Sequence, residues 1–177
     1  MKKVILFSLA ALLALAVSCK KEDKVVNSFI IDGVSKDIEN IYLEKLCYTK
    51  DKNYNIFVSV DGEEDNIQFM LDGESHIGKE VDLSKKDPEI HQGWFWVFDY
   101  YGNGFDIKAD GEPVEQSDFP RDTFESGTLL VKNLGEDKDG VPTLQISLKN
   151  GKVLDTDEQP HSVEFNFKGK VKLVELR

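Results

Sequence analysis

The stretch SVEFNFKGKVKLVEL, residues 162–176, decides the fold class of this chain. Its apolar and polar residues alternate, with one parity holding Val163, Phe165, Phe167, Val171 and Leu173 and the other Glu164, Asn166, Lys168, Lys170 and Lys172. Period two is typical of a strand with one buried face, whereas a helix would scatter these lysines around its circumference. Gly169 falls in the apolar series, where a missing side chain predicts a bend or bulge that lets a long strand pass from one sheet to another.

The same alternation recurs upstream, between turn signals. Ile67, Phe69 and Leu71 share one parity, and Leu144, Ile146 and Leu148 form a similar series. Asp-Gly begins at residues 32, 61, 72, 110 and 139 and Asn-Gly at 150, and these pairs tolerate the positive φ angles of tight hairpins. We expect about ten strands in all, typical of sandwiches and barrels. Further strands are expected near residues 25–31, 54–60, 93–100, 104–109 and 126–134.

Two segments are ambiguous. IENIYLEKLCY, residues 38–48, also suits a helical face, but its neighbours favour a strand. LSKKDPEIHQG, residues 83–93, is expected to be a loop or a single helical turn because Pro88 interrupts any longer element. With many hairpins and no alternation of strands with helices, the predicted fold is an antiparallel β-sandwich. A calycin-like β-barrel is the alternative, and it could enclose a small ligand where a sandwich fills its interior with side chains.

The N-terminus has the layout of a secretory signal. Met1 is followed by two lysines, an uncharged run over residues 4–17, and then Ser18 and Cys19. The run is shorter than the roughly 20 apolar residues that a membrane-spanning helix needs. We therefore predict a signal peptide over residues 1–18, a charged tether over residues 19–24 and a single domain over residues 25–177.

The end of this signal resembles the lipobox of bacterial lipoproteins, carried here by Leu15, Ala16, Val17, Ser18 and Cys19. Ala16 stands where that family more often has leucine. The resemblance implies that Cys19 becomes the first mature residue and takes acyl chains such as palmitate through its sulfur. Charged residues after the cysteine also resemble small cell-envelope lipoproteins of Bacteroidetes, which implies an outer-membrane location on either the periplasmic or the surface face. An ordinary cleaved signal that leaves Cys19 as a free thiol is the alternative.

Composition limits the partners and the redox chemistry. The formal net charge is −11, which opposes binding to nucleic acid and to anionic lipid headgroups. Cys47 is the only cysteine besides Cys19, so a structural disulfide is not expected. Its apolar neighbours indicate a small buried hydrophobe.

The aromatic stretch GWFWVFDYYGNGF, residues 93–105, is the candidate binding segment. Trp94, Trp96 and Tyr100 share one parity, and Tyr101 has the other. Exposed indole and phenol rings flanked by polar side chains could stack against sugar rings, and we name these four residues as candidate ligand contacts. A central strand buried on both faces explains the same residues without any ligand.

Catalytic and metal motifs are weak. His76, His91 and His161 lie far apart with no paired spacing, so no transition-metal site is predicted. The acidic runs at residues 136–140 and 155–158 lack the full calcium loop and fit hairpin tips better. No nucleophile elbow, phosphate loop or dinucleotide fingerprint is present, so neither catalytic residues nor a cofactor are assigned and an enzyme is not expected.

Two functions remain open at this stage. The first is a lipid-anchored extracellular binding module, in which aromatic residues hold a glycan. The second is an interaction component of the envelope, whose strand edges or loops contact another protein. A ligand-enclosing barrel is a third.

Overall fold

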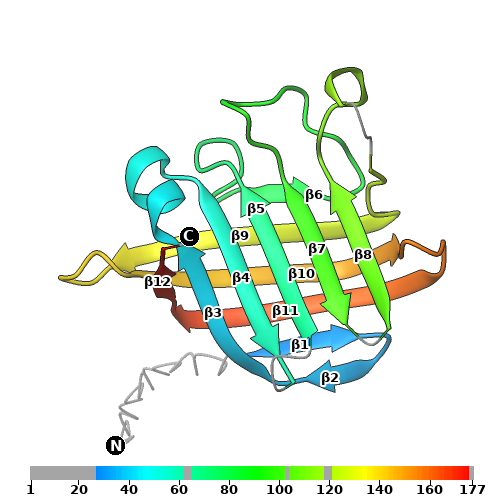
Figure 1. Ribbon diagram of the computed structural model, residues 1–177, viewed down its shortest axis with the longest axis horizontal. Helices are drawn as coiled ribbons and strands as arrows, with labels where there is room; N and C mark the ends of the chain where they lie inside the picture. Colours follow the sequence, from blue (N-terminus) through cyan, green and yellow to red (C-terminus); the bar gives the residue numbers. More distant parts are fainter. Residues whose placement is uncertain (1–26, 62–64, 103, 118–120, 176–177) are drawn as a thin grey trace, which may run out of the picture.

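The computed structural model describes residues 27–61, 65–102, 104–117 and 121–175 (Figure 1). All residues before Asn27 lie outside these ranges, including the predicted signal peptide (1–18), Cys19 and the rest of the tether (19–24). Within them, no helix is both long and apolar enough to cross a membrane. The elements are β1 (Ser28–Ile31), β2 (Val34–Lys36), β3 (Ile38–Glu44), η1 (Cys47–Asp51), β4 (Tyr54–Val60), β5 (Asp65–Leu71), β6 (Glu80–Asp82), β7 (Val97–Gly102), β8 (Phe105–Asp110), η2 (Val114–Gln116), β9 (Ser126–Glu136), β10 (Pro142–Leu154), β11 (Pro160–Lys170) and β12 (Lys172–Val174).

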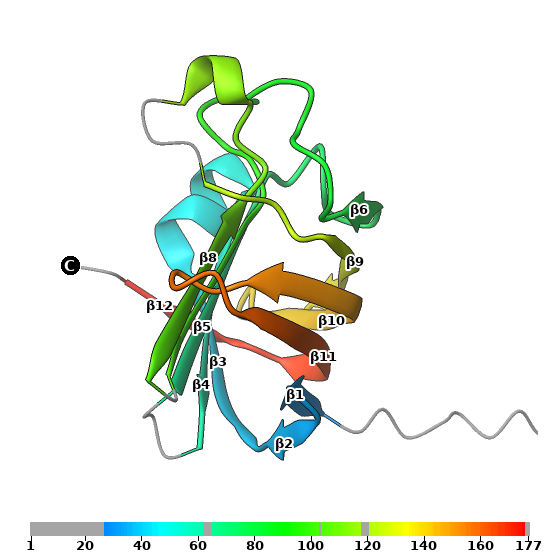
Figure 2. The same ribbon diagram turned by 90° about the vertical axis from the view of Figure 1, so that its right-hand side faces the viewer.

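The strands form two six-stranded sheets packed face to face, which confirms the predicted sandwich (Figure 2). Sheet A has the order β2-β1-β11-β10-β9-β6, and sheet B has the order β12-β3-β4-β5-β7-β8. Neighbouring strands are antiparallel, except that β12 runs parallel to β3. The barrel alternative is wrong, because the described strands of each sheet end at two separate edges instead of closing on one another.

The long strands of the two sheets cross steeply (Figure 1), and at two corners a single residue separates a strand of one sheet from a strand of the other. The first corner is Asp37, between β2 in sheet A and β3 in sheet B. The second confirms the predicted change of sheet, because β11 ends at Lys170 in sheet A and β12 resumes at Lys172 in sheet B, although Gly169 itself pairs regularly with Leu144. Val171, between them, is 3% exposed and anchors this corner in the core. Strands that bend from one sheet into the other are typical of crossed sandwiches.

The core between the sheets is filled by aromatic and aliphatic side chains. Phe69 on β5 packs edge-on against Phe98 on β7 and Phe165 on β11, with ring centroids 5.5 and 5.3 Å apart. Phe29 on β1 contacts Tyr100 on β7 at 5.5 Å, so both sheets contribute to one cluster. Each fully buried side chain of this size stabilises the fold by roughly 1.5–3 kcal/mol. The interior therefore contains protein and not a ligand chamber.

The turn signals have two different outcomes. Asp32 has φ 51° and forms the β1–β2 turn with Gly33, and the Asp139-Gly140 pair lies at the tip between β9 and β10, as predicted. The hairpin expected at Asn150 is wrong, because β10 continues through it and its pairing with β11 shifts there. Asn150 has φ 53°, a backbone conformation that serves a bulge as well as a turn. A Cβ on Gly151 would lie 2.6 Å from the Val163 carbonyl oxygen, so glycine lets the bulged strand approach its neighbour.

Two further expectations need correction. The strand predicted over residues 38–48 ends at Glu44, and the chain then turns into η1, whose Cys47 is only partly buried. Burial and the nearby Glu44 raise the pKa of the Cys47 thiol to about 11. The strand predicted near residues 93–100 begins at Val97, because residues 83–96 belong to a long loop held by side-chain bonds. That loop confirms the prediction for residues 83–93.

Candidate functional site

Two connections cover one end of the sandwich, which we call the open end. They are residues 72–79, between β5 and β6, and residues 83–96, between β6 and β7 (Figure 1). A cleft of about 330 Å³ lies between them. It is lined by Ser75, His76, Lys79, Glu80, Val81, Asp82, Lys85, Lys86, Asp87, Pro88, Glu89 and Trp94.

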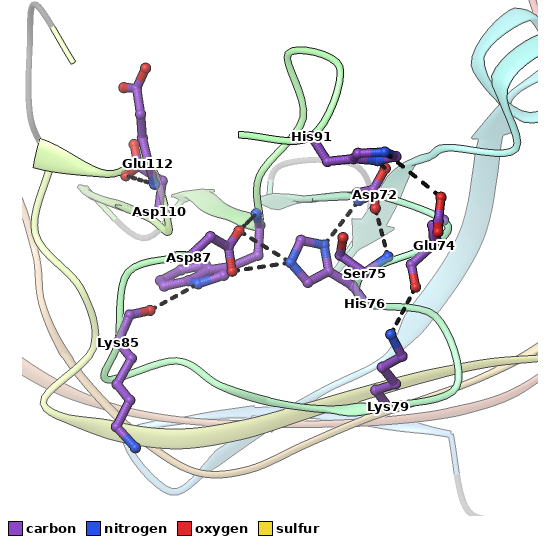
Figure 3. Close-up of polar contacts among 12 residues, drawn as sticks. Asp72, Glu74, Ser75, His76, Lys79, Lys85, Asp87, His91, Asp110 and Glu112 are labelled. Carbon is purple, nitrogen blue, oxygen red and sulfur yellow. Dashed lines mark hydrogen bonds and ion pairs between the residues drawn. The ribbon is translucent and has the colours of Figure 1, made fainter. Parts of the chain in front are cut away.

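Both ring nitrogens of His76 form hydrogen bonds (Figure 3). One bond lies within the first connection, and the other joins it to the second. Nδ1 accepts a hydrogen bond of 3.0 Å from the backbone N–H of Asp72, so this nitrogen carries no proton. Nε2 lies 3.1 Å from Oδ2 and 3.2 Å from Oδ1 of Asp87 and donates its proton there. The side chain is 6% exposed and that of Asp87 13%. The arrangement directs Nε2 at the Asp87 carboxylate and leaves neither nitrogen free to act on a ligand.

Asp72 connects this histidine to a second one. Its Oδ2 lies 2.9 Å from Nδ1 of His91, and its Oδ1 accepts a bond of 2.6 Å from the backbone N–H of Ser75. Burial raises the pKa of Asp72, but these bonds outweigh it and the pKa falls below its usual value. The hydrogen bond to Asp72 raises the pKa of His91, whose Nε2 also lies 3.7 Å from Glu74. The cationic form of His91 is therefore the form that binds Asp72 more strongly.

Asp87 also holds Trp96 in the core. Its Oδ2 accepts a bond of 3.0 Å from the Trp96 backbone N–H, and the Trp96 indole N–H donates to the Lys85 carbonyl at 3.1 Å. The indole is fully buried beside Phe124, with ring centroids 6.5 Å apart. A Cβ on Gly111 would lie 2.3 Å from the indole nitrogen, so glycine is required there. One carboxylate therefore fixes the cleft wall and the core beneath it.

Each lysine of the cleft donates to an acceptor within the protein, and two of the three pair with a carboxylate. Lys86 donates to Oδ1 of Asp110 at 2.8 Å and to the backbone carbonyls of Asp110 and Arg121, which uses its three N–H donors. Lys85 pairs with Asp82 at 2.7 Å, and Lys79 donates to the Glu74 carbonyl at 3.0 Å. The pair with Lys85 lowers the pKa of Asp82 to about 2. The cleft offers polar groups without a strong net field of either sign.

The four predicted aromatic contacts do not gather on one surface. Trp94 lines the cleft and is partly exposed, as the binding hypothesis requires. Trp96 and Tyr100 are fully buried, which corrects their proposed place on an open surface, because both rings pack between the sheets. Tyr101 is 37% exposed but lies on the outward face of sheet B, where its hydroxyl donates to Asp99 at 3.3 Å. Burial therefore explains two of the four rings, and Trp94 alone lines this cleft.

The acidic runs form turns, as expected. Oδ1 of Asp137 accepts the backbone N–H groups of Asp139 and Val141, and Oδ1 of Asp155 accepts those of Asp157 and Gln159. Within the described ranges, no group of three or more His, Cys, Asp or Glu side chains is placed to hold a metal ion.

Sequence spacing missed the cluster that holds the cleft. His76 and Asp87 are 11 residues apart, and Asp72 and His91 are 19 apart, with no periodic pattern between them. The only local signal was the Asp-Gly pair at 72, which marks the turn leading into the first connection. Comparisons with models of protein families, with curated proteins and with solved structures find no match for the chain.

Proposed function

We propose that this chain is a lipid-anchored protein of the bacterial outer membrane that binds a small, uncharged, hydroxyl-rich ligand without transforming it. The cleft at the open end is the binding site, and a sugar is the first candidate. The anchor rests on the N-terminal resemblance at residues 15–19, and the binding role rests on the cleft. The observation that carries the binding role is the partly exposed Trp94 in a polar cleft whose walls are held by internal hydrogen bonds.

The charges around the cleft favour an uncharged ligand. Lys79, Lys85 and Lys86 are each bound by an acceptor from the protein, and Asp82 and Asp87 already hold partners. A charged ligand would have to compete with these partners, whereas hydroxyl groups can share the remaining donors and acceptors. An indole face beside polar side chains suits the apolar face of a sugar ring.

The same bonds favour binding over catalysis. A general base needs a nitrogen or oxygen that can reach the substrate. Both nitrogens of His76 are occupied, one by a backbone N–H and one by Asp87, and Asp87 also accepts from Trp96. These groups support a fixed cleft wall. A ligand recovered unchanged after long incubation with the protein is the expected result.

Tryptophan fluorescence tests the binding role, because the chain has two tryptophans in contrasting places. Titration with mono- and oligosaccharides should change the emission of the wild type and leave Trp94→Phe silent, since only buried Trp96 then emits. Tyr101→Phe is the matched control and should bind as the wild type does. Silence of the wild type with every sugar, or an unchanged response in Trp94→Phe, would refute the sugar-binding role.

The anchor has its own test. Radiolabelled palmitate should enter the wild-type protein in cells, and Cys19→Ala should abolish labelling and release the chain from the membrane fraction. Wild-type protein without label, or one whose mature N-terminus is another residue, would refute the anchor while leaving the cleft unaffected.

A further inference from the structure

The outward face of sheet A carries positive charge on an otherwise acidic protein. Apolar side chains of β9, β10 and β11 are buried in the core, so the alternate positions face outward. On these three strands the outward charged residues are five lysines, Lys132, Lys149, Lys152, Lys168 and Lys170, and one acid, Glu164. The formal charge of the whole chain is −11, so the charge is strongly segregated. We call this surface the lysine face.

The strand register places the lysines close together. Gln145 on β10 pairs with Lys132 on β9 and with Lys168 on β11, so two lysines flank one glutamine in a row across the sheet. Neighbouring strands lie about 4.8 Å apart, which puts these two side chains roughly 10 Å from one another at their bases. Lys170 follows on β11 opposite Thr143. No described element packs over this face (Figure 2).

Most of these ammonium groups have no counter-ion among the residues that the structure describes. Lys170 pairs with Asp137 at 3.0 Å. Lys132, Lys149, Lys152 and Lys168 are exposed and form no ion pair with any residue that the structure describes. Exposed ammonium groups on a sheet attract a nearby anionic surface. Ion pairs elsewhere in the molecule do not cancel the charge of these groups. Acids do border the face, because Glu80 and Asp82 lie on the edge strand β6.

The first described residue, Asn27, lies beside this face and follows the end of the predicted tether (19–24) by three residues (27 minus 24). Asn27 accepts a hydrogen bond of 2.9 Å from the backbone N–H of Lys168, and β1 continues alongside β11. Cys19 precedes Asn27 by eight residues (27 minus 19), which can span at most about 29 Å. A lipid on Cys19 would therefore hold the lysine face within a short distance of the membrane.

We propose that the lysine face docks on the phosphate-bearing anionic headgroups of the membrane to which Cys19 anchors the chain. The inference rests on the proposed lipid anchor and adds an orientation to it. The net charge of the whole chain opposes contact with anionic lipids. That charge is a sum over all surfaces, however, and the lysine face itself is positive. With sheet A against the headgroups, sheet B is directed away from the membrane.

Amine labelling of the full-length lipidated protein tests this orientation. The protein is incorporated into vesicles of phosphatidylcholine alone or of an equal mixture with phosphatidylglycerol, and mass spectrometry measures acetylation of each lysine. Each lysine close to an anionic surface should strengthen attachment about fivefold. We expect labelling of Lys132, Lys149 and Lys168 to fall severalfold in anionic vesicles and to recover at about 1 M salt, where the Debye length is about 3 Å. Lys50 on η1 and Lys108 on the outward face of sheet B are internal controls and should label equally in both.

A charge reversal separates docking from other causes of protection. In Lys132→Glu/Lys168→Glu, labelling of the remaining Lys149 should return to its value in neutral vesicles. The matched variant Lys50→Glu/Lys108→Glu should keep Lys149 protected. These residues are surface-exposed or partly exposed, and circular dichroism verifies that both variants fold.

Each outcome decides between the anchor and the docking. Protein that floats with both vesicles but labels equally on the lysine face refutes docking and leaves the anchor intact, as does protection of Lys50 and Lys108 instead. Protein that floats only with anionic vesicles refutes the anchor and supports docking. Protein that floats with neither refutes both.

Discussion

The two ends of the sandwich provide partners for their buried polar groups in different ways. At the open end, Asp87 is shared by His76 and Trp96 beside a cleft. At the opposite end, Lys36 on β2 forms an ion pair with Asp65 on β5, and both side chains are nearly fully buried. We call this the closed end, because the side chains of this pair are 6% and 4% exposed.

The closed end is packed around its ion pair. Lys36 also reaches Asp61 at 3.1 Å, and the Tyr100 hydroxyl donates to Asp65 at 3.1 Å. A Cβ on Gly102 would lie 1.9 Å from Asp65, so even a methyl group does not fit. Burial lowers the pKa of Lys36, but its bonds with the two aspartates outweigh this and raise it above the usual value. The comparison teaches that a nearly fully buried ion pair holds the closed end, whereas hydrogen bonds shared among loop side chains hold the walls of a water-accessible cleft at the open end.

The largest effect is expected from breaking the ion pair at the closed end. Lys36→Met removes the buried cation that faces Asp65 and leaves the remaining carboxylate buried, which should lower the free energy of unfolding by about 3–5 kcal/mol. Urea denaturation measures it. The double variant Lys36→Met/Asp65→Asn should recover much of the loss, because the amide can still accept from Tyr100. Lys45→Met, which removes an exposed pair with Glu175, is the control and should cost at most about 1 kcal/mol. Equal losses in Lys36→Met and Lys45→Met would contradict the comparison.

A smaller loss is expected at the open end. Asp87→Ala removes the acceptor of both His76 Nε2–H and the Trp96 backbone N–H, so two donors lose their partner. Because water in the cleft can reach part of this site, we expect a loss of about 2–3 kcal/mol, measured by urea denaturation. The same variant should weaken any ligand response of Trp94. Glu89→Ala, an exposed acid on the same cleft, should change stability by less than about 0.5 kcal/mol. A stable Asp87→Ala would show that the loop is held by other contacts.

Strand alternation made much of this fold predictable from sequence. Period two places side chains on opposite faces whatever surrounds them, so the β11 pattern and the missing side chain at Gly169 sufficed to predict a strand that changes sheet. Positive φ is less informative. Asp32 and Asn150 have nearly the same φ, yet one forms a turn and the other a bulge, because the pairing of the flanking segments decides between them.

The site was less predictable, because loops have no period. His76, Asp87 and Asp72 meet through contacts across two connections, and no local rule links their positions. The shared face predicted for Trp94 and Trp96 is wrong for a related reason. Alternation applies to strands, but both residues lie in a loop, where Trp94 lines the cleft and Trp96 is buried in the core. Net charge likewise averages over a positive face that only the strand register brings together.

The smallest effect concerns a titratable contact beside the closed end. His161 on β11 places Nδ1 2.6 Å from Asp32 and Nε2 3.1 Å from Asp155, and its ring stacks on Phe105 at 4.0 Å. Both nitrogens face acceptors, so the bound form is the cation. Burial lowers the pKa of His161, but its bonds to the two aspartates outweigh this and raise it.

The sign of the pH dependence follows from these shifts. A raised histidine pKa gives stability that is complete below the unfolded value near 6.5 and is lost as pH rises through the folded pKa. The pKa values of Asp32 and Asp155 are lowered, so their contribution is lost only at more acidic pH, as the pH falls through those lowered values. The wild type should therefore exceed His161→Gln in stability by about 1–2 kcal/mol at pH 5.5, and the difference should shrink toward pH 9. His91→Gln, with a side chain 34% exposed at the open end, is the matched control and should show the same sign with a smaller amplitude. The more buried of the two histidine contacts should make unfolding free energy depend more strongly on pH. A larger pH dependence from His91 than from His161 would therefore contradict the comparison between the closed end and the open end.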